Sequence, residues 1–302
     1  MKYSCDPSLL FDSQYSEDLD HEYLLNIHEQ LDLNSNQGFY VDSSNCYLKA
    51  SFLNWDSNHF GFPMARLEYL FFTDSNVIEN NWKLFIDWLT ENRINHVSFR
   101  SNSQNIEVIN YLKSNNFSII SRKYMLRIAK DRYVNKQTIL PLFELPLNNE
   151  ILYLGEKSFK YGRFFNDQFI DNSKAKLLYK KWLENSIIDK NHSIILNVKE
   201  DEVLGFVLFK KGLNYSSDLD LQFPHGLISL IATNENHAGK GIGKQLLNSA
   251  MWHLFERESC KVVYANTDIM NLESLRLFQS QGFTVYNELS ELRMWYSSDS
   301  SK

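Results

Sequence analysis

Hydrophobic positions in the first half of the chain change between helical and strand periods. Across residues 76–94 the apolar side chains recur every three or four positions, which predicts an amphipathic helix. Its apolar face consists of Val77, Trp82, Phe85, Trp88 and Leu89. Apolar runs at 96–102 and 118–129 predict strands, and 105–117 predicts a second helix. With an aromatic loop and a strand expected within 48–72, these elements make up a βαβαβ unit.

The second half of the chain has the pattern of an alternating α/β domain. Its expected elements are, in order, helices at 149–159 and 172–188, a hairpin at 192–212, a strand at 225–233, a helix at 243–259, a strand at 261–267, a helix at 271–283 and a pair of strands within 284–296. Gly282 is the expected C′ residue of the last helix. This alternation predicts a central sheet with helices packed on it.

Polar stretches divide the chain. Residues 130–150 carry two of the five prolines and no helical period, which is typical of a linker. The first stretch of the chain is rich in Asn, Ser and Asp, with one helix expected at 20–31, and its composition permits a loosely attached extension. We expect a polar N-terminal extension at 1–46, a first domain at 47–130, a linker at 131–146 and a second domain at 147–302.

Composition and charge narrow the class of protein. At 302 residues the chain is long for one domain, and its hydrophobic content of 43% suffices for packed cores. The net charge of −6 argues against general affinity for nucleic acid or an anionic membrane. Three widely spaced cysteines fit neither a disulfide framework nor a zinc site, so no metal is expected. Without a signal-peptide core or a long apolar run, a cytoplasmic protein is expected.

The main chemical signal is a cluster of glycines. Gly239, Gly241 and Gly243 are three of only 11 glycines, and they lie between an expected strand and an expected helix. Bare backbone N–H groups at a helix N-terminus favour an anion. The spacing is neither the Gly-x-Gly-x-x-Gly of a dinucleotide fold nor a Walker loop. A tight strand-to-helix turn with no ligand is the alternative.

The order of elements around this loop resembles the GNAT acetyltransferase superfamily. The likeness rests on strand, glycine loop, helix, strand, and a second helix that opens at Asn271 and ends in Gly282-Phe283. It implies a GNAT fold with acetyl-CoA as co-substrate, whose pyrophosphate contacts the loop residues Ala238, Gly239, Lys240, Gly241, Ile242, Gly243 and Lys244. Ala238 stands where the family has Gln or Arg, which removes a side-chain contact and leaves the backbone donors.

The resemblance also implies contacts to the pantetheine arm. Leu230, Ile231 and Ala232 correspond to the bulge of the family's fourth strand, where backbone groups pair with pantetheine like an added strand. Asn271 and Ser274 correspond to positions that flank the arm. A helix N-cap is the structural alternative for Asn271, and both roles are compatible.

A narrower likeness covers about residue 53 to the C-terminus. Residues 54–67 and 158–187 resemble segments of proteins similar to dTDP-fucosamine acetyltransferase, which carry a truncated GNAT-like half before a full GNAT domain. This implies an amino-sugar acceptor, and it implies that Arg163 binds the diphosphate of a nucleotide sugar, since a planar guanidinium suits phosphate. An exposed structural arginine is the alternative.

One expected catalytic group is missing. In the sugar acetyltransferases resembled here, a tyrosine seven residues after the asparagine protonates the CoA sulfur, and the count from Asn271 reaches Phe278. Phe278 is therefore expected beside the cofactor but cannot donate a proton. The family's base positions correspond to Leu227 and Ser229, and His225 lies on the same strand face by period two. His225 and Ser229 are the remaining candidates, with an ordinary surface histidine as the alternative for His225.

Two classes of function remain open. The first is an N-acetyltransferase on an amino sugar, nucleotide-linked, by direct attack of the amine on the thioester. The second is a CoA-binding GNAT-fold module with weak or no transferase activity, and transfer to a protein or peptide amine is also open. The expected partner is a small-molecule amine, with neither nucleic acid nor membrane, and a homodimer is left open.

Overall fold

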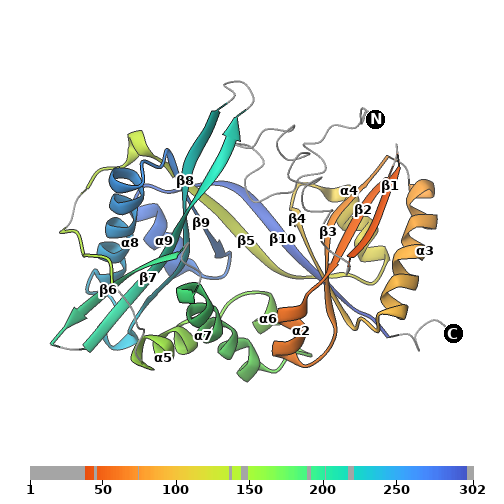
Figure 1. Ribbon diagram of the computed structural model, residues 1–302, viewed down its shortest axis with the longest axis horizontal. Helices are drawn as coiled ribbons and strands as arrows, with labels where there is room; N and C mark the ends of the chain where they lie inside the picture. The colour runs from red at the N-terminus through yellow and green to blue at the C-terminus, as the bar shows by residue number, and fades with distance from the viewer. Residues whose placement is uncertain are drawn as a thin grey trace. The chain divides into compact units, whose positions relative to one another are not determined.

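The computed structural model describes residues 38–43, 46–73, 75–135, 138–143, 149–188, 192–200, 202–216 and 221–297. The chain forms two compact units. Among the described residues, unit 1 comprises 38–122, 215–216 and 288–297, and unit 2 comprises 123–214 and 221–287. Figure 1 shows a sheet and helices in each of them.

The sheet of unit 1 has the strand order β1-β2-β3-β4-β10. These strands are β1 (Gly38–Ser43), β2 (Cys46–Phe52), β3 (Met64–Phe72), β4 (His96–Asn102) and the C-terminal part of β10 (Thr284–Trp295). β3 and β4 run parallel, whereas β10 pairs antiparallel with β4, from Leu289 opposite Asn102 to Trp295 opposite His96.

Two helices cover one face of this sheet. They are α3 (Ser75–Glu91) and α4 (Ile106–Ser114) (Figure 1). Both helices share an apolar core with Val97 and Phe99 of β4. The predicted apolar face of the first helix is confirmed, because Phe85 and Leu89 are fully buried in that core. Asn105 caps α4 by accepting a hydrogen bond from the N–H of Val108 at 3.4 Å.

The opposite face of the same sheet carries polar side chains. Strand alternation puts Arg66 in one row with Ser98 and Arg293, and the next row pairs Arg100 with Glu291.

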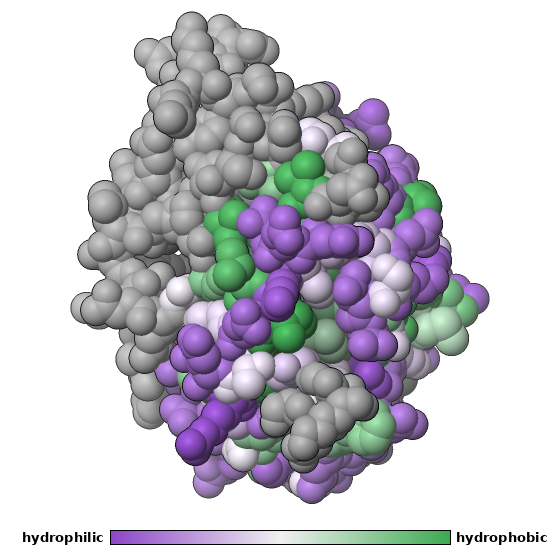
Figure 2. All heavy atoms as spheres, turned by 90° about the vertical axis from the view of Figure 1, so that its right-hand side faces the viewer, coloured by the Kyte–Doolittle hydropathy of each residue, from purple (hydrophilic) through white to green (hydrophobic). Residues whose placement is uncertain are grey.

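Figure 2 views the side of the molecule on the right in Figure 1, and its described surface is mainly hydrophilic, with scattered apolar side chains.

The sheet of unit 2 has the strand order β5-β9-β8-β7-β6. Its strands are β5 (Ser118–Ala129, from Lys123 onward), β9 (Val262–Asp268), β8 (Leu221–Thr233), β7 (Glu202–Ser216) and β6 (His192–Lys199). β8 and β9 run parallel, while β5 with β9 and β6 with β7 are antiparallel.

Helices cover both faces of the unit 2 sheet. α8 (Ile242–Trp252), the π-helical turn after it (His253–Arg257) and α9 (Leu272–Ser280) share one core with β8 and β9. On the other face, α5 (Asn149–Ser158) and α7 (Asn172–Ile188) form a second core with β6 and β7, and the short α6 (Arg163–Asn166) packs on α7. The mixed α/β fold with flanking helices, expected from the sequence, is confirmed.

The described part of the expected linker is held on unit 2. The N–H of Leu140 donates to Ser249 Oγ of α8 at 3.0 Å, and Asn248 Nδ2 donates to Asn135 Oδ1 at 2.9 Å. Farther along, the N–H of Phe143 donates to the carbonyl of Ile194 at 2.9 Å. These bonds attach the segment along α8 and β6.

Several expected elements differ in the structure. Residues 38–43, expected in a loose extension, form β1, because their backbone groups pair with β2. The aromatic loop contains a short helix, α2 (Asn54–Phe60), ended by Gly61 at φ 85°. The expected pair of strands within 284–296 is the single strand β10. The helix expected at 20–31 lies outside the described residues, and the four domain limits stay a prediction.

Candidate active site

The glycine loop has the backbone conformation of a close-approach loop. Gly239 has φ +76° and Gly241 has φ +81°, a region that residues with a side chain rarely adopt. A Cβ added at either position would meet no atom within 4 Å, so the loop surface is open there. At Gly243 an added Cβ would lie 3.3 Å from Leu277 Cδ2 of α9, so this glycine permits close helix packing. Two of the three glycines thus shape an open surface and one serves packing.

The loop leads directly into the N-terminus of α8. Gly241 is the N-cap residue and provides no side-chain hydrogen bond, and the first turn holds no acidic residue. Lys244 is exposed in that turn. A helix N-terminus with free N–H donors and a nearby cation favours an anion, and an acidic cap would oppose one. The loop therefore fits the pyrophosphate of acetyl-CoA, and its contact with Ala238 to Lys244 stays a prediction.

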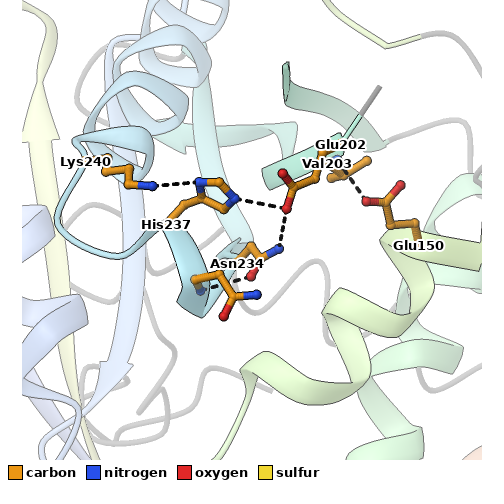
Figure 3. A network of polar contacts seen from close by, with 7 residues as sticks. Glu150, Glu202, Val203, Asn234, His237 and Lys240 are labelled. Carbon is orange, nitrogen blue, oxygen red and sulfur yellow. Dashed lines mark hydrogen bonds and ion pairs between the residues drawn. The ribbon is translucent and has the colours of Figure 1, made fainter. Parts of the chain in front are cut away.

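A polar network fixes the segment before the glycines (Figure 3). His237 Nε2 lies 3.0 Å from Glu202 Oε1, and Lys240 Nζ lies 3.0 Å from His237 Nδ1. Asn234 Nδ2 donates to the same Glu202 oxygen at 3.3 Å. Because an ammonium only donates, Nδ1 of His237 accepts and Nε2–H donates to the carboxylate. The network ties the loop and Lys240 to the start of β7.

The ladder between β8 and β9 is short. It covers His225–Val262, Gly226–Val263 and Leu227–Tyr264 and ends there, although both strands continue. Ile228 packs in the core under α8, whereas Leu230 and Ala232 pack in the core under α5 and α7. In a regular strand Ile228 and Leu230 would share a face, so this change indicates a bulge between them.

This bulge lies beside the residues expected at the pantetheine arm. Ile231, between Leu230 and Ala232, packs toward the α8 core. A strand that leaves its parallel neighbour presents backbone groups to an added partner. That Leu230, Ile231 and Ala232 pair with pantetheine stays a prediction.

Helix α9 begins and packs as its sequence pattern requires. Asn271 is the N-cap and accepts from the N–H of Ser274 at 3.1 Å, so the capping alternative is confirmed for Asn271. Phe278 is only 2% exposed, and its ring packs edge-on against Phe283 with centroids 5.1 Å apart. Phe278 thus fills the core under α9, and its contact with the cofactor stays a prediction.

The candidate proton-transfer groups lie on one strand face. Gly226 faces Leu254, and Ile228 packs in the same core, so the alternating His225, Leu227 and Ser229 face away from α8. The His225 ring is packed against Gly212, where an added Cβ would clash with His225 Cε1. Ser229 is half-buried. His225 is thus half-buried with its ring against Gly212, and the catalytic roles of His225 and Ser229 stay predictions.

Sequence reasoning missed Tyr264 of β9. Its ring is fully buried and meets the His225 ring edge-on, with centroids 5.7 Å apart. It lies at the last pair of the β8–β9 ladder. A phenol in the middle of an apolar strand was the available signal, but its side of the sheet depends on the strand pairing.

Arg163 lies at the first position of α6. The preceding Gly162 has φ +118°, and the Arg163 guanidinium lies 4.5 Å from the centre of the Phe164 ring. Nearby, Tyr179 of α7 stacks on Phe159 at 4.4 Å and on Phe165 at 6.0 Å. Arg163 is thus half-buried on an aromatic surface, and its binding of a diphosphate stays a prediction.

Two kinds of feature are absent from the described residues. In that part of the chain no group of three or more His, Cys, Asp and Glu side chains is arranged to hold a metal ion. None of the helices that the structure describes is long and apolar enough to cross a membrane.

The comparisons with known proteins fit this geometry. Residues 160–283 match the model of the acetyltransferase (GNAT) family. The GCN5-related N-acetyltransferase from Sphaerobacter thermophilus superposes with a TM-score of 0.60 at 12% identity, covering 91% of this chain and 85% of that one. Residues 160–283 are thus similar to the GNAT family, and most of the chain has a GNAT-like fold.

Two curated relatives come from Bacillus subtilis (strain 168). The spore coat polysaccharide biosynthesis protein SpsD is 25% identical over 160 residues, 51% of this chain and 52% of the relative. The spermine/spermidine N(1)-acetyltransferase is 31% identical over 90 residues, 30% of this chain and 58% of the relative. The chain therefore spans little more than half the length of these relatives. The narrower likeness to dTDP-fucosamine acetyltransferase stays a prediction.

Proposed function

We propose that this protein is an acetyl-CoA-dependent N-acetyltransferase that acts on a nucleotide-linked amino sugar. The observation that carries the proposal is the open glycine loop at an uncapped helix N-terminus, with Gly239 and Gly241 both in the left-handed region. The end of the β8–β9 ladder supplies a second feature suited to the same ligand. A relative named for polysaccharide biosynthesis supports a sugar as the acceptor.

The chemistry requires a free amine and a stabilised leaving group. Acetyl-CoA supplies the acetyl group as a thioester. The amine lone pair attacks the carbonyl carbon, so a C–N bond forms while the C–S bond breaks, and the amine proton must leave while the sulfur gains one. Backbone N–H groups of the loop hold the cofactor, and proximity of the two reactants lowers the barrier.

The groups that transfer protons lie on the face of β8 that points away from α8. Phe278 cannot donate, so the polar side chains on that face are His225 and Ser229, with Tyr264 against His225. A neutral imidazole accepts a proton and a phenol donates one. We assign acceptance of the amine proton to His225 and protonation of the sulfur to solvent, because Tyr264 is fully buried.

The second relative favours another amine. The spermine/spermidine N(1)-acetyltransferase matches 90 residues of this chain at 31% identity, so a polyamine is the second candidate acceptor. The CoA-binding module and the peptide N-acetyltransferase remain the functional alternatives.

Turnover of acetyl-CoA against a panel of acceptors tests the proposal. The panel holds amino sugars, nucleotide-linked amino sugars, spermidine and peptides with free amines, with CoA release and acetylated product both measured. We expect the largest kcat/KM with a nucleotide-linked amino sugar. Greater turnover with spermidine or a peptide would show that the acceptor is a polyamine or a peptide amine. Tight CoA binding with no acetylated product from any acceptor would favour the binding module.

A further inference from the structure

One nitrogen of an arginine in unit 1 has no hydrogen-bond partner. Arg66 of β3 is half-buried, and its Nε is shielded from solvent with no hydrogen-bond partner. Within the described part of the chain no ion pair reaches its guanidinium either. A charged group withdrawn from water without a partner destabilises the fold, so such groups are rare unless a ligand pairs with them.

The nearby charges do not satisfy this guanidinium. Burial and the positive charge of Arg100 lower the pKa of Arg66, and Glu68, Asp56 and Glu291 act in the opposite direction. Glu291, only 1% exposed, already accepts from Arg100 Nε at 2.9 Å. The neighbouring carboxylates therefore moderate the field around Arg66 without pairing with it.

Polar and aromatic side chains surround the same place on the sheet. Ser98 is 1% exposed and stands opposite Arg66 on β4, and Arg293 stands opposite Ser98 on β10. Ser98 Oγ makes only a long hydrogen bond of 3.4 Å, to the carbonyl of Ala65. At the end of these strands Trp295 packs at 5.0 Å on both Phe62 and His96. This face offers cationic and hydroxyl donors beside a ring surface.

We propose that the polar face of the unit 1 sheet binds the phosphate or carboxylate group of a small molecule, with Arg66 as its principal contact and Ser98 beside it. A planar guanidinium matches either anion in a bidentate manner, and the Nε–H of Arg66 has no hydrogen-bond partner. The buried position of Ser98 suits a small group that reaches inward rather than a flat protein surface. The proposal concerns unit 1 residues alone and does not depend on acetyl transfer.

The same reasoning predicts the stability of the ligand-free protein. Removing a half-buried charge whose Nε has no hydrogen-bond partner relieves a desolvation cost, so Arg66→Met should unfold at the same or a higher Tm than wild type. If Arg66 served the fold instead, this substitution would lower the Tm. The Tm of the ligand-free variants therefore separates a binding role from a structural one.

Calorimetry with inorganic phosphate, pyrophosphate and acetate tests the site. The proteins are wild type, Arg66→Gln, Arg66→Met, the matched control Arg93→Gln on the exposed turn after α3, and Gly241→Asp to remove the glycine loop as a phosphate site. We expect at least one probe to bind wild type, Arg93→Gln and Gly241→Asp alike. Loss of a charge-assisted contact should weaken that binding about 10- to 100-fold in both Arg66 variants.

Each outcome of the calorimetry either identifies the bound anion or contradicts the proposal. Preference for phosphates over acetate, or the reverse, identifies the anionic group. Equal affinity in wild type and the Arg66 variants would overturn the proposal, as would loss in Gly241→Asp alone or no binding of any probe to wild type. A lower Tm for Arg66→Met would overturn it as well.

Discussion

Replacing Gly241 with Asp tests the assignment of the glycine loop most directly. Gly241 has φ +81°, and an added Cβ would meet nothing within 4 Å, so the substitution causes no clash. Its cost to the fold is the left-handed backbone of a residue with a side chain, about 1–2 kcal/mol. A carboxylate at a helix N-terminus offsets about 0.3–1 kcal/mol of that. The protein should therefore stay folded with a Tm lowered by a few degrees.

The effect on binding should be much larger. At an effective dielectric constant of about 20, two unit charges about 4 Å apart interact by about 4 kcal/mol. With a pyrophosphate on the loop, this repulsion raises the Kd for acetyl-CoA about 1000-fold. Isothermal titration calorimetry at low salt measures that Kd, and circular dichroism confirms the fold.

Gly241→Asn is the matched control. Asn has nearly the size of Asp, tolerates the left-handed region and carries no charge. We expect it to lose far less affinity than Gly241→Asp, so the difference isolates the electrostatic contribution. If folded Gly241→Asp binds acetyl-CoA as tightly as Gly241→Asn, no phosphate lies at this loop and the cofactor assignment is wrong.

Three further predictions concern other positions. Arg163→Ala should raise the KM for the acceptor and leave CoA affinity unchanged, and a loss confined to CoA binding would contradict the assignment. Phe278→Tyr restores a donor and should raise kcat, since a positioned acid contributes about 10²–10⁴-fold; an unchanged kcat would show that another group protonates the sulfur. Burial raises the pKa of the Cys260 thiol from 9.0 to about 11. The native state then keeps a proton that the unfolded chain loses, so the free energy of unfolding should fall by about 2–3 kcal/mol between these pH values. Denaturant titrations across pH should show this component absent in Cys260→Ala, and an equal fall in both proteins would refute it.

Local pattern was sufficient for most helices and for the glycine loop. The face of α3 followed from apolar spacing, because a helix repeats every 3.6 residues wherever it lies. The position of α9 followed from Asn271 and Gly282, whose cap and C-terminal roles depend on adjacent backbone. Gly239 and Gly241 likewise indicated a left-handed backbone conformation, since few other residues adopt it at low cost.

The sequence did not predict which strands pair with one another. Residues 284–296 were expected as a pair of strands, yet they form one strand whose C-terminal part pairs with β4, almost two hundred positions earlier. The bulge after Ile228 was not predicted for the same reason. Alternation of side chains along a strand defines two faces but does not say which core each face meets.

The sequence by itself determined the elements with strong periodicity, the superfamily signal around the glycine loop and the absence of a tyrosine at position 278. Only the tertiary structure decided that Tyr264 meets His225 and that, within the described residues, Nε of Arg66 is shielded from solvent without a hydrogen-bond partner. Periodicity and capping are properties of neighbouring residues, whereas burial and pairing arise from segments distant in the chain. For this reason Arg66 carried no signal in the sequence, and only the pairing of the strands placed it opposite Ser98.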